Sequence, residues 1–284
     1  MSYDIYTGLL KMNCEFESGG EILSYDFNHP FLKSVKEKYN LISIAGDGDD
    51  ISKAYKLMKW VSNHIMHSGN SQAGTKNILD YLDYAFDRGT DYGLNCAMLS
   101  HVLAGCIMAV GLYAREIKLI PCSPYDFDSH RVVQVYSKNL KKWIMLDPTY
   151  SCYVTDKNGN YLSIFEIRQL LSEQEDILLN DEFNYNGQKW NESDYIEYLA
   201  KNMFCLCTPA LMSFDTIKFD RFVYVCPKNF NIRQRDIYCL EYKMKKGGFD
   251  MSEYIETAKN DKYSYLSVEM LFKSPTDYRS DDIK

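Results

Sequence analysis

The sequence lacks the excess of basic residues that nucleic-acid binding requires. It has 32 Lys and Arg against 39 Asp and Glu, which gives a net charge of −7. Proteins that bind DNA or RNA use a basic face to displace the counterions of the phosphate backbone. The 24 tyrosines could stack on bases, but they are not interleaved with Lys or Arg. We therefore expect no nucleic-acid partner and interpret the tyrosines as core and rim residues.

Long apolar runs are missing as well. The longest apolar stretch lies around residues 105–114, which is too short to cross a bilayer. Residues 1–6 do not combine a basic stretch with a following apolar run, so they do not predict a signal peptide. The nine cysteines are an odd number without the spacing of a disulfide framework. Together these features predict a cytoplasmic protein with reduced thiols and no membrane segment.

Motifs for metals and cofactors are scarce. The acidic segment 47–50 is like the start of an EF-hand loop, but Met58 stands where a calcium-binding carboxylate is required. The aspartates are better interpreted as a helix N-cap and first-turn charges. His64 and His67 have the spacing of neighbours on a helix, yet no third ligand is evident. The sequence also has no glycine-rich phosphate loop, and it predicts neither a metal nor a cofactor.

The remaining composition is that of a folded chain with a sizeable core. Apolar residues make up 46% of the 284 residues, which allows one large domain or two smaller ones. We expect a lead-in of strands and one helix over 1–48, a core over 49–175 that carries the motifs described below, and a C-terminal extension packed on that core over 176–284. Apolar spacing predicts helices starting near Asp50 and over 77–86, 96–110 and 164–171, and strands over 114–120, 130–137, 143–147 and 222–226.

Cys96 stands at a position that can activate a thiol. Asn95 is a good N-cap, so Cys96 is predicted to be the first residue of its helix. The unpaired N–H groups and the positive end of the helix dipole favour a thiolate there. Taken alone, Cys96 could equally be a small apolar residue that only packs at the end of a helix.

A histidine and an aspartate on adjacent strands add to this pattern. With a two-residue turn between the strands, Ser137 pairs with Leu140, and His130 lies directly opposite Asp147. Cross-strand partners share a face, with Cβ atoms about 5 Å apart. The carboxylate would hold the imidazole in one tautomer and leave its other nitrogen to take a proton from the thiol. Singly, the pair could be a core histidine and a strand end; with the cysteine, it predicts an activated nucleophile.

Four blocks in this order resemble the core of the bacterial transglutaminase-like superfamily. They are GLNCAML at 93–99, GLYAR at 111–115, DSHRVVQV at 128–135 and KWIMLDPT at 142–149. The resemblance covers about residues 50–170 and implies a papain-like α+β fold, in which a helix packs on an antiparallel sheet, with N- and C-terminal additions. It implies Cys96 as nucleophile, His130 as general base and acid, and Asp147 as the residue that orients the histidine. Val132 and Gln134 stand where many members carry Trp and Glu.

The activity implied is acyl transfer from a peptide or protein amide through a thioester. The backbone N–H of Cys96, at the start of a helix, is the expected oxyanion donor. The acceptor stays open between water, as in a peptidase or deamidase, and an amine, as in a transglutaminase. The alternative is a non-catalytic protein-interaction domain that retains the fold. The oligomeric state is not encoded in any of these patterns.

Overall fold

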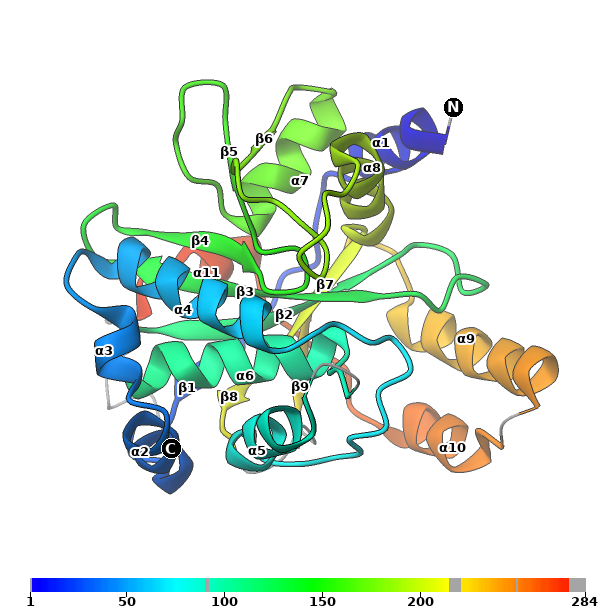
Figure 1. Cartoon of the computed structure of the whole chain (residues 1–284). Helices are drawn as coiled ribbons and strands as arrows, with labels where there is room; N and C mark the ends of the chain where they lie inside the picture. The colour runs from blue at the N-terminus through cyan, green and yellow to red at the C-terminus, as the bar shows by residue number, and fades with distance from the viewer. Residues whose placement is uncertain (1, 90–91, 215–220, 249, 276–284) are drawn as a thin grey trace.

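A computed structural model describes residues 2–89, 92–214, 221–248 and 250–275 (Figure 1). One large sheet has the strand order β10-β9-β7-β2-β3-β4-β5-β6, and its neighbours run antiparallel except β10 and β9. The predicted α+β class, with a helix packed on an antiparallel sheet, is confirmed. The strands are β2 (Ala114–Ile120), β3 (His130–Ser137), β4 (Lys142–Asp147), β5 (Cys152–Thr155), β6 (Leu178–Leu179), β7 (Cys205–Pro209), β9 (Phe222–Val225) and β10 (Ser264–Tyr265).

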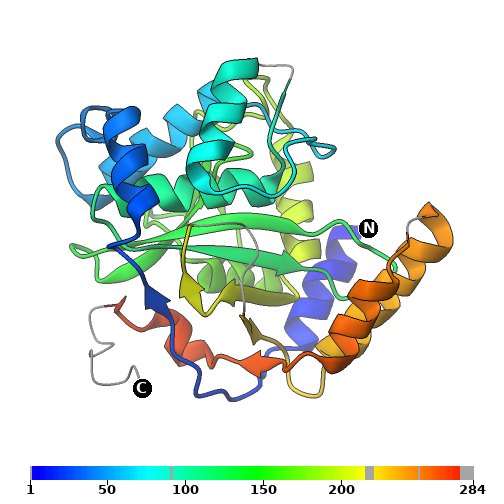
Figure 2. The same ribbon diagram turned by 90° about the horizontal axis from the view of Figure 1, so that it is seen from below.

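Helices cover both faces of this sheet (Figures 1 and 2). One face carries α2 (Pro30–Lys38), α3 (Leu41–Ala45), α4 (Asp50–His64), α5 (Ile78–Arg88) and α6 (Cys96–Ala109). The other carries α1 (Ser2–Met12), α7 (Ile164–Glu173) and α8 (Glu192–Asn202). The described elements also include α9 (Ile232–Gly247), α10 (Ser252–Asn260), α11 (Val268–Phe272) and a small parallel sheet of β1 (Ser24–Tyr25) and β8 (Leu211–Met212).

Alternate strand residues therefore enter two different cores. On β3, Val133 packs in the core that contains α6, whereas Val132 packs in the core that contains α8. Met145 on β4 belongs to the second core as well. Because side chains alternate with a period of two, His130 shares a face with Val132, and Asp147 shares a face with Met145. Both candidate residues thus lie on the α8 face of the sheet.

The β3–β4 hairpin differs from the prediction in its turn. Ser137 pairs with Lys142 and not with Leu140, so four residues connect the strands where two were predicted. His130 consequently lies diagonal to Asp147, not directly opposite it. A displacement of one residue would have put the two side chains on opposite faces, but a displacement of two preserves the shared face. Diagonal neighbours remain within reach of long or aromatic side chains.

The helix that carries Cys96 begins where the sequence predicts. Asn95 is the N-cap in extended conformation, and its side chain accepts a hydrogen bond from the Met98 backbone N–H at 3.1 Å. Residues 98–109 of α6 are all buried, as expected for a helix that is apolar on every side. The helix stops at Ala109, and Gly111 follows with φ +85°, a left-handed conformation that suits glycine.

The two ends of the chain contribute more structure than the sequence predicted. Residues 1–48 contain the three helices α1, α2 and α3, so the prediction of one helix was wrong. Residues 176–284 supply β6, β7, β9 and β10 to the same sheet as the core strands. The domain boundaries at 48 and 175 stay predictions. Among the described helices, none has the length and apolar character needed to span a membrane.

The central position of α6 leads to a stability prediction. Leu103 is fully buried between the sheet and the covering helices, so Leu103→Ala should lower the free energy of unfolding by about 2–5 kcal/mol through the cavity it leaves. Leu140, in the β3–β4 turn, is 49% exposed, and Leu140→Ala serves as the matched control, with an expected change within about 0.5 kcal/mol. Denaturant unfolding of both variants measures the difference. Equal losses would contradict the assigned core.

Candidate active site

The structure brings Cys96, His130 and Asp147 together. Cys96 is the first residue of α6 and is partly exposed, whereas His130 and Asp147 are buried. The Cys96 sulfur lies 4.0 Å from the backbone carbonyl oxygen of Ser129, the residue before His130, and His130 lowers the pKa of this thiol. A thiol at a helix N-terminus, in contact with an imidazole and open to solvent, has the arrangement of a nucleophile.

Asp147 holds the imidazole from the other side. His130 Nε2 lies 2.6 Å from Asp147 Oδ2, which leaves Nδ1 for an interaction with the thiol. The carboxylate accepts two more hydrogen bonds, from the Tyr195 hydroxyl at 2.9 Å and from the Thr149 backbone N–H at 2.9 Å. These donors stabilise a charge that would otherwise be costly to bury.

The same contacts displace the pKa values of the pair in opposite directions. Burial alone would raise the pKa of the Cys96 thiol, but hydrogen bonds and electrostatic attraction from His130 and His67 outweigh burial and lower this pKa to about 6. Burial lowers the pKa of His130, but the charge of Asp147 and its hydrogen bond, together with Cys96, raise it to about 10. At neutral pH the two side chains therefore form a thiolate and imidazolium pair.

A second histidine, which the sequence analysis did not assign to the site, also acts on the thiol. His67 is one of the two side chains that lower the pKa of Cys96, and its Nδ1 lies 2.9 Å from the Tyr185 hydroxyl. Helix α4 ends at His64, so the helical spacing assumed for His64 and His67 does not hold. Instead His67 forms a β-bridge with Leu94, two residues before Cys96.

Aromatic side chains surround the imidazole of His130. The rings of Tyr198 and Tyr150 lie 5.3 and 6.0 Å from it, centroid to centroid. These two rings and their neighbours, which pack on Tyr150 or on each other, form a cluster that we call the aromatic wall: Tyr150, Phe183, Tyr185, Trp190, Tyr195 and Tyr198. All but one come from residues 183–198, outside the segment that resembles the family. The density of aromatic residues there was the available sequence signal.

Two other side chains that could serve in a site have structural surroundings. His101, five residues after Cys96 on α6, is buried, and its Nδ1 lies 2.7 Å from Glu116 Oε1. Trp60 packs against Phe86 with ring centroids 5.4 Å apart. Within the described ranges, no three His, Cys, Asp or Glu side chains are placed to hold a metal ion.

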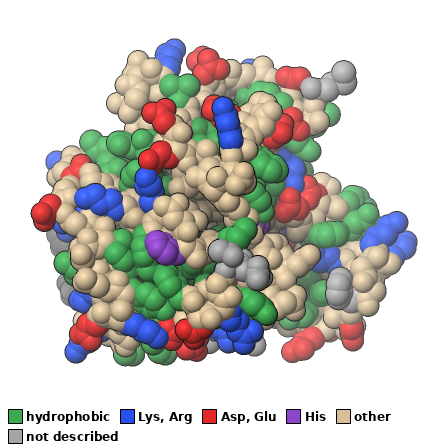
Figure 3. Space-filling model, viewed as in Figure 1, with side chains coloured by type: hydrophobic (Ala, Val, Ile, Leu, Met, Phe, Trp, Pro, Cys, Tyr) green, Lys and Arg blue, Asp and Glu red, His purple; other side chains and the backbone are tan. Residues whose placement is uncertain are grey.

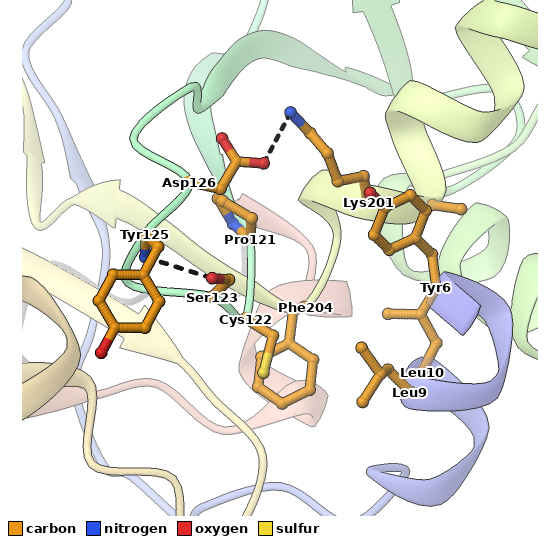
Figure 4. Close-up of a pocket in the computed structure, with 11 residues that line it drawn as sticks. Tyr6, Leu9, Leu10, Pro121, Cys122, Ser123, Tyr125, Asp126, Lys201 and Phe204 are labelled. Carbon is orange, nitrogen blue, oxygen red and sulfur yellow. Dashed lines mark hydrogen bonds and ion pairs between the residues drawn. The ribbon is translucent and has the colours of Figure 1, made fainter. Parts of the chain in front are cut away.

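A cavity of about 340 Å³ lies at the far end of α8 (Figure 4). Leu9 and Leu10 of α1 face the sulfur of Cys122 and the ring of Phe204 across it, and Lys201 stands at its rim. The lining includes no member of the Cys96, His130 and Asp147 set. Burial raises the pKa of Cys122, and the nearby Arg235 offsets this only partly. Cys122 is thus a second partly exposed thiol without a histidine among the causes of its pKa.

The charged surface is mixed in sign. On the face shown in Figure 3, Lys and Arg side chains are interspersed with Asp and Glu. Near the site, Lys201 forms ion pairs with Asp126 at 3.0 Å and with Asp128 at 3.1 Å. Asp128 also accepts a hydrogen bond from the Tyr198 hydroxyl at 3.3 Å. These contacts connect the loop before His130 to helix α8.

The fold and this geometry define a class: an α+β protein with a helix-borne cysteine facing a histidine on an antiparallel sheet. Residues 39–148 match the family model described as "Transglutaminase-like superfamily". The match confirms the resemblance drawn from the four sequence blocks.

Comparison with individual proteins adds little to the family match. A solved structure described as a "Putative Cysteine Protease from Cytophaga hutchinsonii" is 17% identical, with a TM-score of 0.34. The alignment covers 46% of this chain and 44% of that one, so it spans less than half of the solved protein. At this TM-score we base no argument on it. No curated protein matches the sequence.

The lowered pKa of Cys96 predicts a specific pH profile for alkylation. Only the thiolate reacts with iodoacetamide, so the rate at Cys96 should be half-maximal near pH 6, fall below that pH as the thiol is protonated, and level off above it. Cys122 should react appreciably only at more alkaline pH, because burial raises its pKa. Peptide mass spectrometry after timed labelling separates the two thiols in one sample. A Cys96 rate that is still rising between pH 8 and 9 would contradict the thiolate assignment.

Proposed function

We propose that this protein is an enzyme that transfers an acyl group from a peptide or protein amide through a thioester on Cys96. The observation that supports this proposal most is the hydrogen bond of 2.6 Å between His130 Nε2 and Asp147 Oδ2, which leaves Nδ1 for the thiol. A histidine buried only for packing needs no such orientation toward a partly exposed cysteine. The transglutaminase-like core over 39–148 supports the same chemistry.

In the first half of the reaction the thiolate of Cys96 attacks the amide carbonyl carbon. The C–S bond forms, and the carbonyl electron pair moves to the oxygen, which becomes an oxyanion near the backbone N–H of Cys96. The imidazolium of His130 then gives its Nδ1 proton to the leaving nitrogen. The C–N bond breaks, the amine departs, and the acyl group remains as a thioester.

In the second half His130 acts as a base. Its imidazole takes a proton from the acceptor, either water or a primary amine, and the acceptor attacks the thioester carbon. The C–S bond breaks, and the thiolate and the imidazolium are restored together. Asp147 remains ionised throughout and keeps the histidine in the productive orientation. Tyr150 and Tyr198 pack against His130, which is buried, so this proton transfer takes place largely away from bulk water.

Substitutions in the triad should separate the roles of its members. Cys96→Ala should abolish turnover, because the covalent step loses its nucleophile. Asp147→Asn should reduce turnover by about 10³- to 10⁴-fold, because an amide favours the wrong tautomer of His130. Cys122→Ala is the matched control and should retain wild-type turnover. The assays are hydrolysis of fluorescently quenched casein and incorporation of a fluorescent primary amine into casein.

Thermal unfolding of each variant accompanies these assays. Turnover by Cys96→Ala equal to that of the wild type would exclude the enzyme proposal. Loss of folding in Asp147→Asn, with normal reactivity of Cys96 in the folded fraction, would assign Asp147 a structural role. The relative rates of the two casein assays identify water or an amine as the preferred acceptor.

A further inference from the structure

His67 is held in place by a segment far away in the chain. Asn186 and Gly187 both have left-handed φ values, +52° and +75°, and form a turn in which Tyr185 and Gln188 exchange backbone hydrogen bonds of 2.9 Å. The Asn186 side chain accepts from the His67 backbone N–H at 2.7 Å and donates to the His67 carbonyl at 3.1 Å. One hairpin thus fixes both backbone groups of a single residue 119 positions earlier.

The same hairpin orients the ring. The Tyr185 hydroxyl lies 2.9 Å from His67 Nδ1, so the other ring nitrogen, Nε2, is left for the Cys96 side chain. Burial raises the pKa of Tyr185, so its hydroxyl keeps its proton at neutral pH and can donate it to Nδ1. In that arrangement the histidine carries its hydrogen on Nε2 and is a donor toward Cys96.

The backbone around His67 lies unusually close to the segment before the nucleophile. The Leu94 N–H donates to the Met66 carbonyl at 2.9 Å. A Cβ atom on Gly93 would lie 2.5 Å from that same carbonyl oxygen, so only glycine permits this approach. The glycine of the first family-like block therefore serves to bring His67 alongside Cys96.

We infer that His67 is a catalytic residue that, with the backbone N–H of Cys96, donates a hydrogen bond to the oxyanion of the tetrahedral intermediate. The inference rests on the proposed acyl transfer. The carbon that bears the oxyanion is bonded to the Cys96 sulfur, and the β-bridge between His67 and Leu94 holds this histidine beside the segment that carries the thiol. Before the reaction the same N–H stabilises the thiolate. His130 and His67 thus have different roles: His130 transfers protons, and His67 stabilises the negative charge of the oxyanion.

Two probes that react with the same thiol test this role. Alkylation by iodoacetamide forms no oxyanion, whereas acylation by p-nitrophenyl acetate passes through a tetrahedral intermediate that has one. His67→Ala should therefore slow acylation of Cys96 by about 10²- to 10³-fold. At pH 8.5 it should change alkylation by less than about threefold, because the thiolate still forms beside His130. Cys96→Ala measures the background reaction of each probe at residues other than Cys96.

Three further variants sharpen the result. His67→Gln keeps an N–H donor and should recover at least part of the acylation rate. Tyr185→Phe removes the hydroxyl that orients the ring and should slow acylation by about tenfold, with alkylation unchanged. His64→Ala, at an exposed histidine three residues away, is the matched control and should behave as the wild type. If thermal unfolding shows that His67→Ala is not folded, His67→Gln and Tyr185→Phe test the role instead.

Unchanged acylation in His67→Ala, or an equal fall in acylation and alkylation, would overturn the oxyanion role and leave the proposed function intact. A wild-type protein that is alkylated at Cys96 but never acylated there would overturn the proposed function, and the role of His67 with it.

Discussion

The buried carboxylate of Asp147 is the group on which the rest of the structure depends. It is fully buried and receives hydrogen bonds from His130 on β3, from the Tyr195 hydroxyl on α8 and from the backbone N–H of Thr149. An ionised group in this position is tolerated only while its oxygens are satisfied. The need to satisfy them therefore ties two strands and a helix together at one point. The hydrogen bonds that stabilise the buried carboxylate therefore also fix the orientation of the His130 ring.

The candidate site lies where the two layers of the molecule meet. Cys96 begins α6, whose residues pack in one core, while His130 and Asp147 face the core on the other side of the sheet. Because the first residue of α6 and the first residue of β3 come to the same end of the sheet, thiol and imidazole can touch across this boundary. The segment that matches the family model supplies both groups. Residues 183–198 pack against the histidine and the aspartate, with Tyr195 hydrogen-bonded to Asp147 and Tyr198 packed against His130.

Two histidines near one thiol show how a partner decides the chemistry of a side chain. The charge of Asp147 raises the pKa of His130, which suits this histidine to the proposed role of proton carrier. The partner of His67 is the Tyr185 hydroxyl and not a carboxylate. A hydroxyl can fix the tautomer of the ring without adding a charge. Because of this difference, we attribute proton transfer to His130 and oxyanion binding to His67.

The sequence by itself determined the features that depend on near neighbours. An asparagine before a helical pattern caps that helix wherever it packs, so the position of Cys96 at the start of α6 followed from local rules. The shared face of His130 and Asp147 also followed, because it depends only on the period of two in a strand and survives an error of two residues in register. The length of the turn itself was misjudged, since several turn lengths suit that segment. Only the tertiary structure brought Tyr195 to Asp147 and the hairpin around Tyr185 to His67. Those contacts join residues 48 and 118 positions apart. No periodicity in the chain predicts contacts at such separations, because they depend on how whole helices, strands and loops pack together.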